Sequence, residues 1–445
     1  MTVTVHPSSI GGAIKAPASK SSMQRACALA LLNEGETMIL NPGKSNDDLA
    51  ALEIVQKLGA VVSINTPTGS VEKLRIKNEN TKAFEGEINC GESGLGIRMF
   101  APIAALSSEE IIINGEGSLL KRPMHFFDEI FPQLGISIQT NNGYLPIKIK
   151  GPLQPADITI DGSLSSQFLT GLLMAFGKAA TKPVTITVKD LKSKPYIDLT
   201  LQMMSAFGYN VENADYEKFL IRPSFGFAQD LQNTIDPSTS LSMLRTYTVE
   251  GDWSGAAFLL VAGAIAGTIT VAGLDINSAQ ADKAILNALK DCGAEITMKE
   301  NSVIVNSFSG GWGEAFHFNA TDCPDLFPPL VALAAYCKGT SVIEGVNRLQ
   351  HKESNRAVTL QEELGKMGVE IKLGGDKMMI TGGNALKGTT VQSHHDHRIA
   401  MACAVAALKA NKETMIGEAE AVNKSYPDFF NDLKLLGADV SLPIS

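Results

Sequence analysis

The feature that most constrains the fold is a segment that recurs six times along the 445 residues. In each copy an apolar, helix-like stretch ends in a hydrophobic residue and a glycine, and a strand-like stretch follows directly. The copies read QKLGAVVSI, PQLGISI, SAFGYNV, KDCGAEITM, GKMGVEI and KLLGADVSL, with Gly59, Gly135, Gly208, Gly293, Gly368 and Gly437 spaced 69 to 85 residues apart. Glycine readily ends a helix in the left-handed conformation, so we predict six helix C-termini here. Such regular spacing is typical of repeated structural units.

A second shared piece precedes each of these segments. It is an apolar helix followed by a short strand, as in ACALALLNEGETMIL and FLLVAGAIAGTITVAG. A further strand follows the first five glycines after a polar turn, as in GYLPIKIKG. The predicted unit is therefore helix, strand, helix, strand, turn, strand. The sixth copy ends before its last strand, and the initial MTVTVHP is a strand without a copy of its own. We expect this strand to complete the sheet of the last three copies.

These units predict an α/β protein with two domains of three repeats each. One domain is continuous over 19–249, and the other is discontinuous and combines 1–18 with 250–445. The two chain crossings between them would form a hinge. Helices as apolar as AAFLLVAGAIAG have no polar face, which indicates burial on most sides.

Composition narrows the class of protein. A chain with 44% hydrophobic residues can bury sizeable cores, and no apolar run approaches the roughly 20 residues of a membrane span. The start lacks a basic segment followed by an apolar one, and the six cysteines form no CxxC pair. The net charge of −9 argues against nucleic acid as the main partner. We therefore expect a cytoplasmic protein that binds neither membranes nor nucleic acid. We also expect it to be a monomer.

Unusual polar residues gather at two equivalent places in the units. The first is the start of the leading helix, which carries Ser19 to Ser22 with Arg25, Glu92 to Gly94 with Arg98, Ser165 to Gln167, Asp322 to Asp325, and Asp396 to Arg398. The second is the loop after the next strand, which carries Asp47 and Asp48, Lys121 and Arg122, Ser193 to Tyr196, Lys352 and Glu353 with Arg356, and Lys424. Free N–H groups make a helix N-terminus an anion site, and arginine forks suit phosphate or carboxylate. The coincidence in five of six copies predicts a cleft for small phosphorylated carboxylates.

Each of these residues also has a plainer interpretation. Ser165 and Ser166, and equally Asp47 and Asp48, could simply cap helices. A pair such as Lys121–Arg122 is usually a solvated face. The string HHDHR at 394–398 could bind metal, although its spacing does not place three imidazoles on one helical face. The fourth copy has no cation at either place, so we expect a structural role for it.

At these residues the chain resembles the enolpyruvyl transferases, and closely the branch that uses shikimate 3-phosphate. The resemblance runs from Lys20 to about Phe430 and rests on PASKSSMQR, DGSLSSQFLTGLL, KSKPYIDLT, HKESNR, DHRIAMA and NKSYPDFF. It implies a two-domain inside-out α/β barrel. It also implies a transferase of the shikimate pathway, which leads to chorismate and the aromatic amino acids. The enolpyruvyl group of phosphoenolpyruvate would pass to the 5-hydroxyl of shikimate 3-phosphate by addition and elimination, and phosphate would leave.

The resemblance also implies roles for individual residues, without any metal or organic cofactor. The shikimate 3-phosphate contacts would be Lys20, Ser21, Arg25, Ser165, Ser166, Gln167, Ser193, Tyr196, Asp325 and Lys352. The phosphoenolpyruvate contacts would be Lys20, Gly94, Arg122, Gln167, Arg356, Arg398 and Lys424. The catalytic groups would be Asp325, Glu353 and Lys20, because addition and elimination require groups that exchange protons and can reverse their roles. Asp325 is the expected base at the hydroxyl, and Glu353 or Lys20 is the donor at C3. His397 either supports Glu353 or is structural.

Two rival interpretations and one departure complete the prediction. The sister branch that acts on a UDP-linked amino sugar usually carries a cysteine donor in the loop of the second copy, whereas no cysteine lies between Cys90 and Cys292 here. A catalytically silent anion-binding protein would lack Asp325 or Glu353, and both are present. The departure is Glu92-Ser93-Gly94-Leu95, where the family commonly has Asn-Ala-Gly-Thr. It places an acid beside the predicted phosphoenolpyruvate site.

Overall fold

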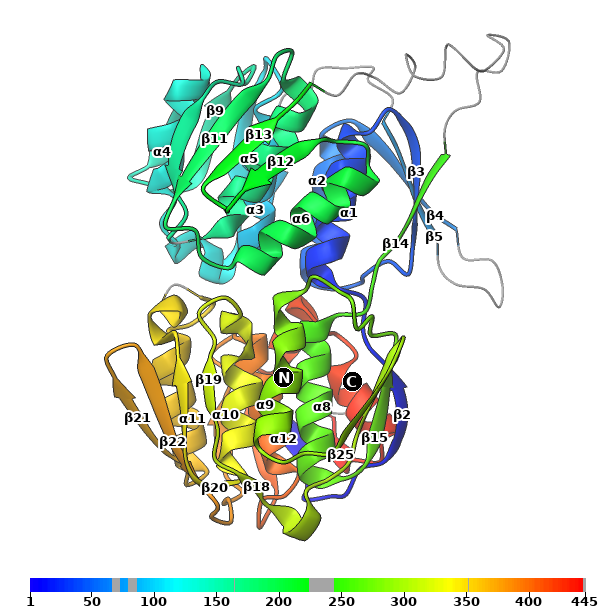
Figure 1. The fold of residues 1–445 in the computed structure, drawn as a ribbon, viewed down its shortest axis with the longest axis vertical. Coiled ribbons are helices and arrows are strands. Elements are labelled where there is room, and N and C mark those ends of the chain that lie inside the picture. Colours follow the sequence, from blue (N-terminus) through cyan, green and yellow to red (C-terminus); the bar gives the residue numbers. More distant parts are fainter. Residues whose placement is uncertain (66–72, 79–85, 164, 224–243, 351, 443–445) are drawn as a thin grey trace. The chain divides into compact units, whose positions relative to one another are not determined.

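The computed structural model describes residues 1–65, 73–78, 86–163, 165–223, 244–350 and 352–442. The chain forms two compact units (Figure 1). One is Lys20–Val249, here the central unit, and the other joins Met1–Ser19 to Glu250–Ser445, here the terminal unit. Each unit contains three of the repeats. Among the described residues, no helix is both long and apolar enough to cross a membrane.

The leading helix of each repeat packs inside its unit, with the sheets outside (Figure 1). The leading helices are α1 (Lys20–Leu32), α3 (Gly94–Ala104) and α5 (Ser166–Ala179) in the central unit, and α8 (Trp253–Ala266), α10 (Phe327–Ala335) and α12 (His397–Ala407) in the terminal unit. Every residue of α10 and α12 is buried. In α1, α3 and α8 the residues that are not buried, Lys20, Ser21, Arg98 and Ser254, all lie near the N-terminus. The apolar runs therefore build the core, and the helix starts carry the accessible polar groups.

A second helix follows in every repeat and ends at a repeat glycine. These helices are α2 (Asn46–Lys57), α4 (His125–Ile130), which continues into η2 (Phe131–Leu134), α6 (Lys194–Ala206), α9 (Ile285–Asp291), α11 (Arg356–Lys366) and α13 (Phe429–Leu435). All six repeat glycines have φ between 73° and 96°, which confirms the predicted left-handed helix ends. At Gly59, Gly293 and Gly368 a Cβ would meet no atom within 4 Å, so the backbone conformation alone favours glycine there.

Each repeat has its own sheet. In the central unit these sheets contain β3 (Gly35–Leu40), β4 (Ala60–Asn65), β5 (Lys73–Asn78) and β14 (Leu244–Thr248); β6 (Gly86–Asn89), β7 (Glu110–Asn114), β8 (Ser137–Asn141) and β9 (Tyr144–Lys150); and β10 (Ile158–Asp161), β11 (Val184–Lys189), β12 (Val211–Ala214) and β13 (Lys218–Ile221). In the terminal unit they contain β2 (Gly12–Lys15), β15 (Ile269–Ala272), β16 (Ile296–Lys299) and β17 (Ser302–Val305); β18 (Gly313–Glu314), β19 (His317–Asn319), β20 (Cys337–Glu344), β21 (Glu370–Gly374) and β22 (Lys377–Gly382); and β1 (Val3–Val5), β23 (Thr390–Gln392), β24 (Thr414–Gly417) and β25 (Val440–Ser441).

The structure adds one parallel strand to the sheet of each predicted unit, except in the fifth repeat, where both β18 and β19 pair in parallel with β20. A strand before the leading helix pairs in parallel with the strand after it, as β6 does with β7, whereas the remaining pairs of each sheet are antiparallel. The repeat is therefore strand, helix, strand, helix, strand, turn, strand. The added strands are only two to five residues long and partly exposed. Apart from β10, whose ITID alternates apolar and polar residues, they lack the apolar alternation that identifies a strand in sequence.

The chain ends fill the two places that the terminal unit leaves open. β1 pairs with β24 and β25 and occupies the place of the missing last strand of the sixth repeat, which confirms the prediction for MTVTVHP. β2 pairs in parallel with β15 and supplies the first strand of the fourth repeat. In the central unit β14 does the same for the first repeat by pairing with β3. Sheets in both units are thus closed by segments distant in sequence.

Candidate active site

In the central unit the first repeat joins its two polar places. Lys20, the first residue of α1, places its Nζ 2.9 Å from Oδ2 of Asp47 in the first turn of α2, and its side chain is 16% exposed. Asp48 instead completes a capping box with Ser45, the N-cap of α2. The sequence left open whether these two aspartates cap a helix or belong to the site, and the structure gives each a different role. Asp48 caps the helix, and Asp47 holds the lysine.

Arg25 lies one turn after Ser21 and is fully buried. Its guanidinium donates to the Ser21 carbonyl (2.9 Å), the Thr200 hydroxyl (2.9 Å) and the Tyr196 carbonyl (3.4 Å). Because burial disfavours the charged form, the pKa of Arg25 falls to about 10. The guanidinium links the first repeat to the third through neutral oxygens.

The second repeat brings two guanidiniums to the start of α3. A Cβ on Gly94 would lie 2.5 Å from Arg122 Nη1 and 3.0 Å from Arg98 Nη1. Arg98 also donates to the Gly94 carbonyl (3.1 Å) and to the side-chain oxygen of Gln167 (3.4 Å). Arg98 was not among the predicted contacts, although it follows Gly94 by one turn as Arg25 follows Ser21. Glycine at position 94 leaves room for two cations at one helix N-terminus.

Glu92 has a structural partner. Its Oε2 accepts a hydrogen bond from the backbone N–H of Ser118 (2.9 Å), in the 3-10 helix η1 (Gly117–Lys121) that precedes Arg122. A Cβ on Gly117 would lie 2.5 Å from the Glu92 carboxyl carbon, so the helix approaches Glu92 closely. Glu92, which stands where the family commonly has Asn, therefore holds the loop that carries Arg122.

The third repeat supplies hydroxyls. Ser165 is the N-cap of α5 and accepts from the Gln167 N–H (3.1 Å), as its capping interpretation predicts, and Ser166 is buried in the first turn. Ser193 precedes α6 with φ 58° and ψ 44° and is also buried. A serine rarely adopts this left-handed conformation, and such residues concentrate at functional sites. Tyr196 follows in the first turn of α6 and is half-buried.

In the terminal unit three cations surround Asp325, which lies in the 3-10 helix η5 (Pro324–Leu326) at the start of α10. Its Oδ1 lies 2.9 Å from Arg356 Nη1 and 3.1 Å from Lys352 Nζ, and its Oδ2 lies 3.2 Å from Arg398 Nη2. Burial alone would raise the pKa of Asp325. Arg398, Lys352 and Arg356 outweigh it and hold the pKa well below the usual value. The carboxyl is therefore ionised at neutral pH, with 23% of its side chain exposed.

Arg356 connects Asp325 to two further carboxylates. Its Nε lies 2.9 Å from Oδ2 of Asp396, and its Nη2 lies 3.2 Å from Oδ1 of Asp396 and 2.5 Å from Oε2 of Glu353. The other oxygen of Glu353 lies 3.8 Å from Lys424 Nζ, at the end of the 3-10 helix η7 (Ala419–Lys424). The structure thus brings together Asp325, Lys352, Glu353, Arg356, Arg398 and Lys424, all predicted site residues.

Asp396, like Arg98, is a site residue that was not among the predicted contacts. It is fully buried, caps α12 by accepting from the Arg398 N–H (3.0 Å), and also binds Arg356. Its position in the sequence was the available signal. An aspartate at the start of a helix can cap the helix and at the same time form an ion pair with an arginine of the site. His397 is buried next to it, with Nδ1 3.9 Å from Asp396 Oδ1.

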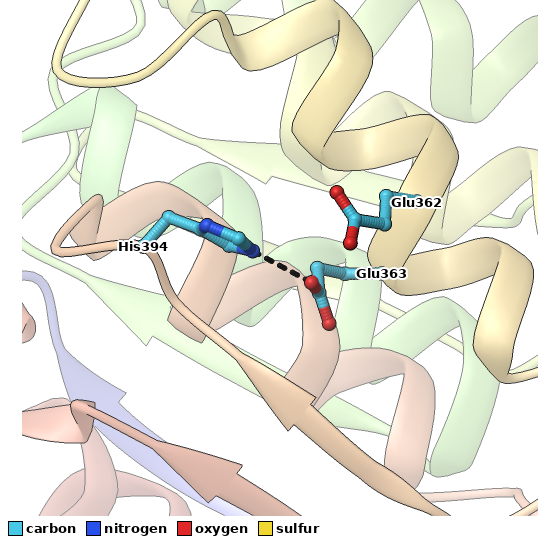
Figure 2. Close-up of side chains that lie close together, drawn as sticks. All are labelled: Glu362, Glu363 and His394. Atoms are coloured by element: carbon cyan, nitrogen blue, oxygen red, sulfur yellow. Dashed lines mark hydrogen bonds and ion pairs between the residues drawn. The ribbon is translucent and has the colours of Figure 1, made fainter.

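The histidine string contributes to a separate cluster. Glu362, Glu363 and His394 place ligand atoms within 4.8 Å of one another, close enough to hold a metal ion (Figure 2). Both oxygens of Glu363, however, accept hydrogen bonds from Lys366 Nζ, at 2.8 and 2.9 Å. A cation would have to displace this ammonium. The geometry therefore favours an ion-pair network.

The fourth repeat has capping and packing bonds at the equivalent places. Asp252 caps α8 by accepting from the N–H groups of Ser254 and Gly255, and Gln280 bonds to the backbone of Gly251 and Trp253. Ser254 donates to Asp282 in the 3-10 helix η3 (Ala281–Ala284), and burial raises the pKa of Asp282 to about 7.

Comparison with known proteins identifies the family of the chain. The model of the EPSP synthase (3-phosphoshikimate 1-carboxyvinyltransferase) family matches residues 5–433. The 3-phosphoshikimate 1-carboxyvinyltransferase of Clostridium kluyveri is 36% identical over 438 residues, which is 98% of each chain, and that of Aeropyrum pernix is 35% identical over 98% of this chain and 96% of its own. The solved EPSP synthase of Acinetobacter baumannii aligns with a TM-score of 0.78 and 25% identity over 99% of this chain and all of its own.

A second solved structure shows how widely the fold is shared. The enolpyruvyl transferase NikO from Streptomyces tendae aligns with a TM-score of 0.76 over 99% of this chain and 98% of its own, at 18% identity. At that identity the likeness concerns the fold, which is the two-domain α/β fold of enolpyruvyl transferases. The matches over nearly the whole length at 35–36% identity are more specific. The chain therefore belongs to the EPSP synthase family.

Proposed function

We propose that the protein transfers the enolpyruvyl group of phosphoenolpyruvate to the 5-hydroxyl of shikimate 3-phosphate and releases phosphate, in the shikimate pathway. Family membership supports the reaction. The observation that carries the proposal is the carboxylate of Asp325 bound to Lys352, Arg356 and Arg398, with Glu353 on the same Arg356. It combines the anion-binding groups and the pair of carboxylates that the chemistry needs.

The cations of the terminal unit are the proposed phosphoenolpyruvate ligands. Arg356, Arg398 and Lys424 each contact a carboxylate within the protein. The phosphate and carboxylate of phosphoenolpyruvate offer stronger, bidentate partners for the arginines. As Arg356 and Arg398 turn to the substrate, the pKa of Asp325 rises, since their proximity, together with that of Lys352, is what holds it down. Asp325 would thus become a competent base only when the substrate is bound.

Proton transfer needs two positions. Asp325 takes the proton of the attacking 5-hydroxyl, and a second group protonates C3 and later takes that proton back. Glu353 and Lys20 are the two candidates for this donor. Glu353 is held by Arg356 at 2.5 Å, and Lys20 by Asp47 at 2.9 Å. Separate Glu353→Gln and Lys20→Met variants, assayed for exchange of the C3 protons with solvent deuterium, would assign the step.

The remaining residues supply binding. Ser165, Ser166 and Ser193 would hold the phosphate of shikimate 3-phosphate at the starts of α5 and α6, where free N–H groups favour an anion. Lys20, Ser21, Arg25, Gln167, Tyr196 and Lys352 would surround its ring and charges. Arg122, Gly94 and Gln167 would add contacts to phosphoenolpyruvate. Arg98, close to Gly94 and Gln167, is added to this set.

The deciding experiment is a coupled phosphate-release assay. Phosphate should appear only when shikimate 3-phosphate and phosphoenolpyruvate are supplied together, and not when a UDP-linked amino sugar replaces shikimate 3-phosphate. Release with the UDP-sugar would move the protein to the sister branch. Binding of both substrates without turnover would make it an anion-binding protein.

We also propose that the protein works as a cytoplasmic monomer that binds neither membranes nor nucleic acid. Its six cysteines are all buried and free, which suits a reducing compartment. Light scattering coupled to gel filtration should give the mass of one 47.3 kDa chain.

A further inference from the structure

The turn between β23 and α12 has an unusual backbone. His394 and His395 both have positive φ, 52° and 56°. Non-glycine residues rarely adopt this conformation, and two in succession persist only where surrounding contacts hold them. The turn leads directly to Asp396 and Arg398 of the candidate site. What holds it therefore also fixes these two residues.

Glu363, in the second half of α11, holds the turn on one side. Its side chain is fully buried, and its Oε1 lies 2.6 Å from His394 Nε2 (Figure 2). Its Oε2 accepts from the Gln392 N–H at 3.0 Å. Burial would raise the pKa of Glu363, but bonds from Lys366 and His394 outweigh it and lower the pKa. An ionised carboxylate thus binds both a side chain and a backbone group of the turn.

Glu418 holds the turn on the other side. It precedes η7, and its carbonyl accepts from the Ser393 hydroxyl at 2.9 Å. Its carboxylate lies 3.2 Å from the His395 backbone nitrogen, which donates to it, and 3.2 Å from the His395 ring Nε2. Every residue from 392 to 395 is therefore bonded to α11 or to the start of η7.

These contacts join the three elements that carry the proposed phosphoenolpyruvate cations. α11 begins at Arg356, α12 carries Arg398 in its first turn, and η7 ends at Lys424. We propose that Glu363 and His394 are positioning residues that set the spacing of Arg356, Arg398 and Lys424, and so determine affinity for phosphoenolpyruvate. This rests on the proposed function. Moving an arginine by a fraction of an ångström weakens its bidentate contact with an anion. Glu363 and His394 therefore act on the substrate through the arginines that they position.

The test substitutes His394 and compares the two substrates. His394→Ala should raise the KM for phosphoenolpyruvate about tenfold and leave the KM for shikimate 3-phosphate within about twofold. His394→Gln, whose amide can still donate to Glu363, should restore most of the affinity. The matched control is His317→Ala, because His317 forms a similar pair with Glu344 (3.1 Å) in the same unit, on β19 and β20. Its KM values should be unchanged.

Direct titration with inorganic phosphate gives a second measurement that needs no turnover, and His394→Ala should weaken this binding to a similar degree. The inference is overturned if His394→Ala leaves phosphoenolpyruvate affinity unchanged, if both KM values rise equally, or if His317→Ala has the same effect. If His394→Ala does not fold, the isosteric Glu363→Gln replaces it. This variant should raise the KM for phosphoenolpyruvate severalfold, and an unchanged KM would refute the inference. Inactive wild-type protein would overturn the proposed function alone, since phosphate titration still decides the role of the turn.

Discussion

Arg25 in the central unit and Arg356 in the terminal unit are equally buried, yet their surroundings are opposite. Arg25 donates to two carbonyls and a hydroxyl, and burial lowers its pKa to about 10. Around Arg356, burial also acts to lower the pKa, but Asp396, Glu353 and Asp325 outweigh it and raise the pKa. One buried charge is held by dipoles and the other by counter-ions.

The difference suits the two substrates. A buried cation held by neutral oxygens keeps a field that attracts an incoming anion, as the proposed role of Arg25 towards shikimate 3-phosphate requires. A cation held by carboxylates binds a new anion only by exchanging partners, which couples phosphoenolpyruvate binding to the state of Asp325. In the proposed function, the central unit would therefore supply prepared binding groups. The terminal unit would supply groups whose protonation responds to the substrate.

The largest effect is expected when a carboxylate partner of Arg356 is removed. Asp325→Asn removes the proposed base and one counter-ion of Arg356, so kcat should fall about 10³-fold. Binding of phosphoenolpyruvate should be equal or tighter, because the cations lose a competing anion. Steady-state kinetics and equilibrium titration measure the two effects separately. Near-normal turnover would refute the assignment of the base, and Asp322→Asn, three residues earlier, is the control, with activity within about threefold of wild type.

The next effect compares the two arginines directly. Arg356→Met leaves Asp396, Glu353 and Asp325 without a shared partner, and removing one member of a buried ion pair costs about 3–5 kcal/mol of stability. Arg25→Met removes hydrogen bonds to neutral acceptors only and should cost about 1 kcal/mol. Chemical denaturation measures both. Arg25→Met should still raise the KM for shikimate 3-phosphate at least tenfold. Equal destabilisation by the two substitutions would remove the distinction between the units.

Much of the fold was predictable because the six glycines and the apolar helices leave strong local signals. The strand before each leading helix was not, since strands such as β18 and β23 have two or three residues and gain their stability from a neighbour distant in sequence. The isolated N-terminal strand β1 was predictable only through the repeat, because the sixth copy lacked a strand.

The site was predictable as a set of positions but not as a set of contacts. Repetition indicated which places would carry polar groups, whereas partners depend on tertiary packing. Nothing local distinguishes Asp47, which binds Lys20, from Asp48, which caps α2. Asp396 resembled an ordinary helix cap, although its second interaction with Arg356 comes from an element 40 residues away in sequence.

The smallest expected effect tests whether the units differ in burial generally or only in their arginines. Among the residues that the structure describes, each unit has one buried aspartate whose pKa burial raises from 3.8 to about 7, Asp48 in the central unit and Asp282 in the terminal unit. Between pH 4 and 7 the folded state keeps a proton that the unfolded state has released, so each group's contribution to stability falls as pH rises. Asparagine cannot titrate. Relative to wild type, Asp48→Asn and Asp282→Asn should therefore each gain on the order of 2 kcal/mol of stability from pH 4 to 7, on top of any constant loss of hydrogen bonding.

Denaturation of the wild type and of both variants at several pH values measures this slope. A slope in only one of the two variants would mean that the units differ in how they bury carboxyl groups as well. Equal slopes would confine the difference to the partners of the two arginines. The contrast between Arg25 and Arg356 would then reflect where carboxylates were placed, because both units would penalise an unpaired buried charge to the same degree.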